Sequence, residues 1–404
     1  MYFPDLFAEA LREPHCVITY HVGRFLAGLD PTRAMIEGED GDFDLAEFAG
    51  AGQCSCRRLD EIHAQVSVRW SEDRGNQEYA RNAWFEVEWQ GHALDVVVMD
   101  WDDRCWPYYW IMADSPGVAR EFHAAVCGFD PELDGEVLVF DGGRFQESRG
   151  LHDQLARSTE ANLVLPPRFK ADLFADAGRF FASKATYDRL GVPWKRGLLF
   201  VGPPGNGKTH AIKALIQATG RPCLYVKTFR SEKLTEASNI RRVFERARRA
   251  SPCILVLEDL DSLVTAENRS FFLNEMDGFA ANSGILTVAT TNHPGRLDPA
   301  ILDRPSRFDR KYHFALPAPA ERLAFIRAWN DALEPGLRLG APALAEVAEE
   351  TEGFSFAYLK ELFLSSVMTW VAEDRPIEDV VRDQVAALAD QMRSTEAADR
   401  AEPA

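Results

Sequence analysis

The stretch Gly202-Pro203-Pro204-Gly205-Asn206-Gly207-Lys208-Thr209 decides the fold of this chain. It follows the apolar run Leu198-Leu199-Phe200-Val201 and precedes a helix-like segment at 211–216. A strand, a glycine-rich turn and a helix together present backbone N–H groups and a helix N-terminus to phosphate oxygens. Because both flanks fit, a chance Gly-Lys-Thr turn is the weaker interpretation, and the pattern predicts a phosphate-binding loop.

The residues at the end of this loop add specific chemistry. Lys208 would reach the β- and γ-phosphates of a nucleoside triphosphate. The Thr209 hydroxyl would ligate Mg²⁺, and His210 completes the set of residues expected around the cofactor.

Bulk composition limits the class of protein. A chain of 404 residues suggests two or three domains, and 46% hydrophobic with 27% charged residues is typical of a soluble globular protein. No apolar run approaches the length of a membrane span, the first residues lack the pattern of a signal peptide, and seven cysteines do not suggest a disulfide framework. The simplest expectation is a cytoplasmic location.

The negative charge is concentrated in the first part of the chain. Residues 1–150 carry −17 of the total formal charge of −18. Phosphates would be repelled by such a surface, so this part is a poor nucleic-acid binder by itself. Solubility is the simpler interpretation of the charge, and an acidic docking face is the alternative.

Segments before residue 160 predict a small α+β domain. Strand-like patterns occur at 83–89, 94–99, 108–112 and 136–140, with a helix-like segment at 118–126, and we expect an antiparallel sheet. The aromatic residues between Trp101 and Trp110 are interpreted as core packing rather than a peptide-binding patch. Cys54, Cys56 and His63 lack the spacing of a structural zinc site and are interpreted as ordinary residues.

Polar residues follow two apolar strands downstream of the loop. The run 253–257 ends in Glu258 and Asp259, and the run 285–291 ends in Asn292. Ligands of open α/β sheets bind at the carboxyl ends of the strands. One acid of the pair would position the water shell of Mg²⁺, and the next would orient and deprotonate the attacking water.

The order of these motifs resembles the AAA ATPases of the AAA+ superfamily. The phosphate loop, the acidic pair and the Thr-Asn strand end are followed by Leu297-Asp298-Pro299-Ala300 and then by Arg304 and Arg307. The later segment 351–359 resembles the family's motif in a helical lid near the nucleotide. Within the family, the nearest likeness is to the subgroup of the mitochondrial chaperone that assembles respiratory complex III.

The resemblance implies an α/β fold with several parts. A P-loop parallel-sheet ATPase core would span 161–316 and a C-terminal helical lid 317–393, followed by a polar tail at 394–404. A small acidic α+β N-terminal domain at 1–160 would precede the core and recruit partners.

The resemblance also implies the cofactors ATP and Mg²⁺ and a role for each matched residue. The loop cradles ATP, Glu258 takes the Mg²⁺ side with Thr209, and Asp259 takes the water-activating position. Asn292 is the polar sensor. The remaining matched positions are Arg304 and Arg307, as arginine fingers for the neighbouring subunit's ATP, and Gly191 and Val192, where the adenine pocket begins.

Three departures from the family pattern stand out. Most members have Asp before Glu, and here Glu258 comes first. Asp303 is an extra residue before Arg304, which leaves open which arginine points across the interface. The segment 228–236 lacks the aromatic-apolar-Gly triplet with which many members grip polypeptide, although Phe229 could substitute.

The resulting functional hypothesis is an ATPase that hydrolyses ATP to remodel or translocate a protein client. It would act as a ring homo-oligomer, either a hexamer or a heptamer, without a membrane span. One alternative is a nucleic-acid motor or loader with the basic segment 241–249 in its channel, although nucleic acid is the less favoured partner. A second alternative is a nucleotide-dependent assembly scaffold.

Overall fold

The structure, a computed structural model, describes residues 6–39, 41–71, 75–101, 106–129, 137–277, 282–302, 304, 306–373 and 375–401. The chain folds into two compact units, Met1–Leu133 and Asp134–Ala404. Among the described residues, no helix is both long enough and apolar enough to cross a bilayer.

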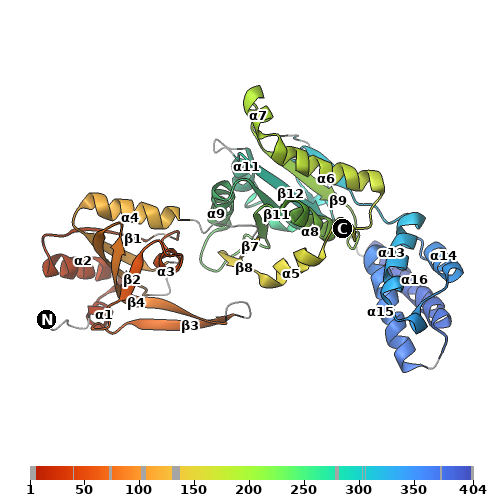
Figure 1. Ribbon diagram of the computed structural model, residues 1–404, viewed down its shortest axis with the longest axis horizontal. Helices are drawn as coiled ribbons and strands as arrows, with labels where there is room; N and C mark the ends of the chain where they lie inside the picture. Colours follow the sequence, from red (N-terminus) through yellow and green to blue (C-terminus); the bar gives the residue numbers. More distant parts are fainter. Residues whose placement is uncertain are drawn as a thin grey trace. The chain divides into compact units, whose positions relative to one another are not determined.

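The first unit is built on an antiparallel sheet with helices on both faces (Figure 1). Its described strands run in the order β1-β6-β5-β4-β2, with β3 paired to β4. Helices α1 and α2 cover one face, and α3 and α4 cover the other. The bounds are α1 Leu6–Ala10, α2 Ile18–Leu29, β1 Ala34–Glu39, α3 Leu45–Gly50, β2 Ser55–Arg58, β3 Gln65–Ser71, β4 Gly75–Trp89, β5 His92–Met99, β6 Tyr108–Ala113 and α4 Pro116–Gly128.

Three aromatic residues of the cluster between Trp101 and Trp110 pack inside this unit, as the simpler interpretation predicted. Trp101, Tyr109 and Trp110 are all buried. Cys54 and Cys56 are half-buried free thiols, and burial raises the pKa of Cys56 to about 11. No group of three His, Cys, Asp or Glu side chains that could hold a metal ion occurs in the described part of the chain.

The second unit contains the predicted parallel sheet. Its strand order is β13-β9-β12-β11-β10-β7-β8, and every pair is parallel except β7 with β8. Side chains alternate between the faces: Leu198 and Phe200 pack with α6 and α8, whereas Leu199 and Val201 pack with α9 and α11. The bounds are β7 Val137–Asp141, β8 Arg144–Glu147, α5 Arg149–Arg157, α6 Pro167–Ala182, α7 Lys184–Leu190, β9 Arg196–Val201, α8 Lys208–Thr219, β10 Cys223–Val226, α9 Glu236–Arg249, β11 Cys253–Leu257, α10 Leu260–Leu263, α11 Arg269–Asp277, β12 Ile285–Thr291, α12 Pro299–Leu302 and β13 Arg310–His313.

The position of β7 corrects the predicted domain boundary. The sequence pattern predicts a strand at 136–140 in the N-terminal sheet. Glu136 itself lies outside the described residues. The structure instead pairs β7 in parallel with β10, and β8 folds back on β7 as a hairpin. The compact units therefore divide at Leu133 rather than near residue 160.

A helical lid follows the sheet. It consists of α13 Pro319–Ala332, α14 Ala341–Glu350, α15 Phe356–Ala372 and α16 Ile377–Ala401. Ile326, Leu359, Leu362 and Val381 are among the buried residues of its own core. The predicted polar tail from residue 394 differs from the structure, in which α16 continues through Ala401.

The start of β9 packs closely against the chain that enters β13. The Gly197 N–H donates to Asp309 Oδ2 at 2.7 Å. A Cβ atom at position 197 would lie 1.9 Å from the Arg307 carbonyl oxygen and 2.9 Å from the Phe308 Cα. Only glycine fits, because both neighbours are backbone atoms.

We expect Gly197→Ala to reduce the free energy of unfolding by about 3 kcal/mol, since the methyl group forces the two backbones apart. Denaturant unfolding of the full chain measures this change. Gly178→Ala in α6 is the matched control, because no atom lies within 4 Å of its added Cβ. Its effect should be neutral or slightly stabilising. Equal stability of the two variants would contradict the packing argument.

Candidate nucleotide-binding and hydrolysis site

The carboxyl ends of β9, β11 and β12 form one edge of the parallel sheet. β12 pairs with β9 on one side and with β11 on the other, with Thr291 opposite Val201 and Ala289 opposite Leu257. The phosphate loop follows β9, the acidic pair follows β11, and Asn292 follows β12. The sheet therefore brings three separately predicted motifs to the edge where ligands of such sheets bind.

Lys208 already lies over the loop. It is the first residue of α8, and its Nζ donates to the Gly202 carbonyl at 2.6 Å and to the Pro203 carbonyl at 2.8 Å. Burial lowers the pKa of Lys208, and the carboxylates of Asp259 and Glu258 oppose that shift. The Lys208 ammonium therefore lies at the phosphate loop, where it could donate to phosphate oxygens in place of these carbonyl oxygens.

The loop also contacts the helical lid. Gly205 has a φ of +77°, and a Cβ there would lie 2.7 Å from Ala357 Cβ and 2.9 Å from Ser355 Oγ. The Ala357 N–H donates to the Gly205 carbonyl at 3.1 Å. The next residue, Asn206, is buried and donates through Nδ2 to the Pro203 carbonyl at 3.4 Å. The predicted lid motif at 351–359 thus lies against the loop.

Glu258 is held by hydroxyl groups from two different elements. The Thr209 hydroxyl donates to Glu258 Oε1 at 2.5 Å, and the Tyr225 hydroxyl on β10 donates to Oε2. Burial, together with the hydrogen bond to Glu258, raises the pKa of Tyr225 above its ordinary value, so the hydroxyl keeps its proton. Sequence reasoning missed Tyr225; a hydroxyl within an apolar strand was the available signal.

Asp259 has a different environment from its neighbour. Its backbone is left-handed, with φ +48° and ψ 56°, and its N–H donates to Thr290 Oγ1 at 2.9 Å. Its side chain is exposed at the sheet edge, where Asn292 Nδ2 donates to Oδ1 at 3.0 Å. The predicted sensor therefore orients the predicted water-activating acid. Thr290, which also positions Asp259, was not among the predicted residues.

The two predicted arginine fingers differ in their surroundings. Arg307 is buried, and it donates through Nε to Asp277 Oδ2 at 2.6 Å and through Nη1 to the Ala300 carbonyl. Arg304 is exposed, and no hydrogen bond or ion pair links its side chain to another described residue. Asp303 lies outside the described residues. Arg307 is therefore engaged within the chain, whereas Arg304 is not bonded to another described residue.

Gly191 and Val192, the predicted adenine contacts, lie just before the amino end of β9. Gly191 ends α7, and Val192 lies just ahead of Trp194, whose carbonyl accepts from the Gly284 N–H at the amino end of β12. The phosphate loop follows the opposite end of β9, so this strand separates the two residues from the loop. The segment beside α8 is instead the one at 157–163, because Asn162 Oδ1 lies 3.1 Å from His210 Nε2.

The segment after β10 offers no gripping aromatic. Phe229 is buried beside Phe272, and its carbonyl accepts from Asn239 Nδ2 at 2.8 Å. The suggestion that Phe229 replaces a pore aromatic is therefore wrong. It belongs to the core between the parallel sheet and helices α9 and α11.

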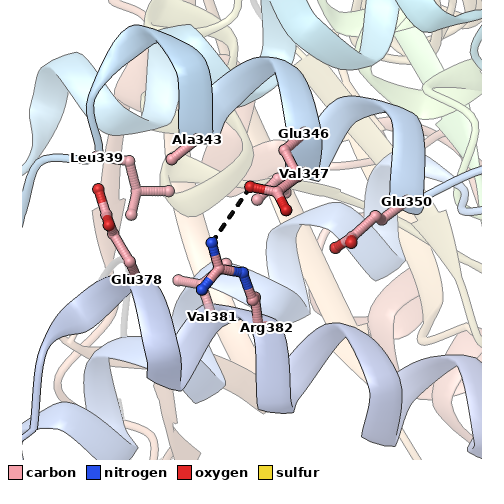
Figure 2. A pocket seen from close by; sticks show the side chains of 8 residues that line it. All are labelled: Leu339, Ala343, Glu346, Val347, Glu350, Glu378, Val381 and Arg382. Atoms are coloured by element: carbon pink, nitrogen blue, oxygen red, sulfur yellow. Dashed lines mark hydrogen bonds and ion pairs between the residues drawn. The ribbon is translucent and has the colours of Figure 1, made fainter.

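A cavity in the lid is too small for a nucleotide (Figure 2). It lies between α14 and α16, has a volume of about 10 Å³, and is bordered by the ion pair of Arg382 with Glu346 at 3.3 Å. Such a volume holds at most about one water molecule. This cavity is therefore not a nucleotide site.

The residues at the edge fit the implied cofactors. Mg²⁺ prefers hard oxygen ligands, and the Thr209 hydroxyl and Glu258 carboxylate supply two such groups in direct contact. The loop and the N-terminus of α8 suit a polyphosphate, since they combine backbone donors with the Lys208 ammonium.

Comparisons with known proteins agree with this geometry. Residues 198–316 match the family model described as ATPase family associated with various cellular activities (AAA). The chain carries an AAA ATPase domain. This domain includes the phosphate loop, the acidic pair, Asn292 and both arginines.

Individual relatives cover only part of the chain. An ATP-dependent zinc metalloprotease FtsH of Acidothermus cellulolyticus is 38% identical over 48% of this chain and 31% of its own length. A protein of Methanocaldococcus jannaschii, named as a homologue of a 26S proteasome regulatory subunit, is 34% identical over 45% of this chain and 51% of its own length. The chain thus spans about a third to a half of these relatives.

The stability of the folded chain depends on pH through His210. Desolvation lowers the pKa of His210, and the nearby Lys213 lowers it further. The folded chain then binds this proton less tightly than the unfolded chain, where histidine titrates near pH 6.5. The contribution to stability is fully present above about pH 6.5 and is lost as the pH falls through the unfolded and then the folded pKa.

We therefore expect the thermal midpoint of the wild-type chain to fall more between pH 7.5 and pH 5.5 than that of His210→Gln. His152→Gln, which alters an exposed histidine on α5, is the control and should follow the wild type. Parallel pH profiles for the wild type and His210→Gln would refute the assigned effect.

Proposed function

We propose that this protein hydrolyses ATP and uses the energy to remodel or translocate a protein partner. One observation carries the proposal: Lys208, the Glu258–Thr209 pair and the Asp259–Asn292 pair meet at a single sheet edge. Isolated strand-end acids are common, but their meeting with a phosphate loop matches what phosphoryl transfer needs.

The reaction would follow from these positions. The loop N–H groups and Lys208 hold the phosphates of ATP. Thr209 and Glu258 would hold Mg²⁺, whose positive charge would offset that of the phosphates. Asp259, oriented by Asn292, takes a proton as the water oxygen attacks the γ-phosphorus and the bond to the leaving ADP oxygen breaks.

Two substitutions separate binding from turnover. Lys208→Ala should abolish detectable ATP binding, because it removes the charge that faces the phosphates. Asp259→Asn should keep the binding affinity and lower kcat by roughly 10²–10⁴. Asparagine tolerates the left-handed backbone at this position, so the fold should be unaffected. Binding is measured with a fluorescent ATP analogue and turnover by phosphate release.

A specific result would reverse the acid assignment. If Asp259→Asn turned over ATP normally while Glu258→Gln were inactive, then Glu258 would be the water-activating acid.

Ring assembly is part of the proposal, with six or seven subunits. Arg304 is exposed, and Leu364, Met368 and Val371 form an exposed apolar stripe on α15 at helical spacing. A head-to-tail interface between different patches of identical subunits closes into a ring when the rotation permits. In such a ring Arg304 would serve the neighbouring site, and Arg307 would hold the segment that carries it.

A mixing experiment tests this arrangement. Arg304→Ala alone should lower kcat by about 10³-fold or more and leave ATP binding intact. Mixed with Asp259→Asn, it should regain activity, since each Arg304→Ala site receives the arginine of an Asp259→Asn neighbour. Arg296→Ala, a nearby exposed arginine, is the matched control and should stay active.

Differently tagged subunits would first be shown to assemble together. If co-assembled mixtures remained as inactive as the separate variants, Arg304 would not act between subunits.

A protein client is favoured over nucleic acid. The relatives include, by name, ATP-dependent proteases and a homologue of a proteasome regulatory subunit, which favours a protein client. The 404 residues contain no His-Glu-x-x-His, the motif of zinc proteases. Arg242 on α9 donates to the Gly143 carbonyl, and Arg248 pairs with Glu275, so these two arginines of the basic helix are engaged internally. We propose that the acidic first unit recruits the client, that the protein acts in the cytoplasm, and that its nearest relatives are in the chaperone subgroup that assembles respiratory complex III.

A further inference from the structure

Tyr225 contacts Glu258 of the acidic pair. It lies on a strand that contains none of the recognised motifs. This strand is β10, and the Tyr225 backbone is in register with Val256 of β11. Glu258 is two residues beyond Val256, so both project from the same side of the strand. The phenol extends diagonally along this face, and its hydroxyl donates to Glu258 Oε2.

The two oxygens of Glu258 therefore have separate partners. Oε1 accepts from Thr209, the second residue of the helix that follows the phosphate loop, and Oε2 accepts from Tyr225. A glutamate has one more rotatable bond than an aspartate, so an untethered carboxylate would sample more orientations. The hydrogen bond from Tyr225 removes that freedom.

We propose that Tyr225 is a positioning residue that fixes Oε2 of Glu258, so that Oε1 faces Thr209 and the Mg²⁺ of the bound nucleotide. This inference rests on the proposed function, because it concerns the metal of the same site. Tyr225 touches neither the nucleotide nor the reacting atoms in this role. It acts through Glu258, as outer partners orient the ligands of many metal sites.

The role predicts a selective effect of Tyr225→Phe. The affinity for a fluorescent ATP analogue in EDTA should be unchanged, because the loop and Lys208 are intact. The Mg²⁺ concentration for half-maximal enhancement of that affinity should rise roughly tenfold. Steady-state turnover should show the same tenfold shift in its Mg²⁺ dependence.

Tyr312→Phe is the matched control. Tyr312 also lies on a strand of this sheet and donates its hydroxyl to a buried carboxylate, Asp176, at 3.2 Å. Removing that hydroxyl removes a similar hydrogen bond far from Glu258 in the fold. A change in Mg²⁺ dependence in this variant as well would assign the effect to general loosening of the sheet.

A double substitution tests the route through Glu258. Glu258→Asp shortens the side chain by one methylene and withdraws the carboxylate from the Tyr225 hydroxyl. Tyr225→Phe should then cause no further change in the Mg²⁺ dependence. Independent effects of the two substitutions would overturn the inference.

The outcomes distinguish the inference from the function on which it rests. If the wild type bound the ATP analogue without any response to Mg²⁺, the proposed hydrolytic site itself would be wrong. If the wild type responded to Mg²⁺ and Tyr225→Phe matched it, or lost affinity equally in EDTA, only the role of Tyr225 would be overturned.

Discussion

The pairing of β12 with both β9 and β11 is the constraint on which the site depends. All seven residues of β12 are buried, so the strand is fixed on both faces as well as along both edges. A shift of one residue in its register would turn every side chain to the opposite face. It would also move Asn292 along the edge, away from Asp259. The geometry of the hydrolytic residues is therefore a property of the sheet rather than of the loops.

Much of this site could be predicted because its information is local. The glycine-rich loop, the acids after β11 and the amide after β12 each follow an apolar run, and parallel strands bring such ends together. Gly191 and Val192 are not brought to this edge, for the same geometric reason. They are close to the loop in sequence, but the length of β9 places them at the opposite edge of the sheet.

Other features depend on strand pairing and burial in the folded chain, which a local sequence pattern does not specify. A strand pattern at 137–141 does not say which sheet it joins, and β7 pairs with β10 rather than with the N-terminal sheet. Phe229 occurs in a polar segment, yet it is buried beside Phe272. Tyr225 contacts Glu258 only because β10 and β11 are neighbours in one particular register. The unusual order of the acids fits both environments: the shorter aspartate occupies the left-handed position, and the longer glutamate reaches the phenol.

The lid is attached to the phosphate loop through main-chain atoms. The Ala357 N–H and the Gly205 carbonyl belong to groups that every non-proline residue possesses. Replacing the Ala357 side chain leaves its N–H donor in place, whereas a Cβ atom added at Gly205 would lie 2.7 Å from Ala357 Cβ. The link therefore constrains Gly205 more than Ala357. Displacement of the loop on the scale of a hydrogen bond is therefore transmitted to the first turn of α15. The link thus joins the position of the phosphate loop directly to that of the lid.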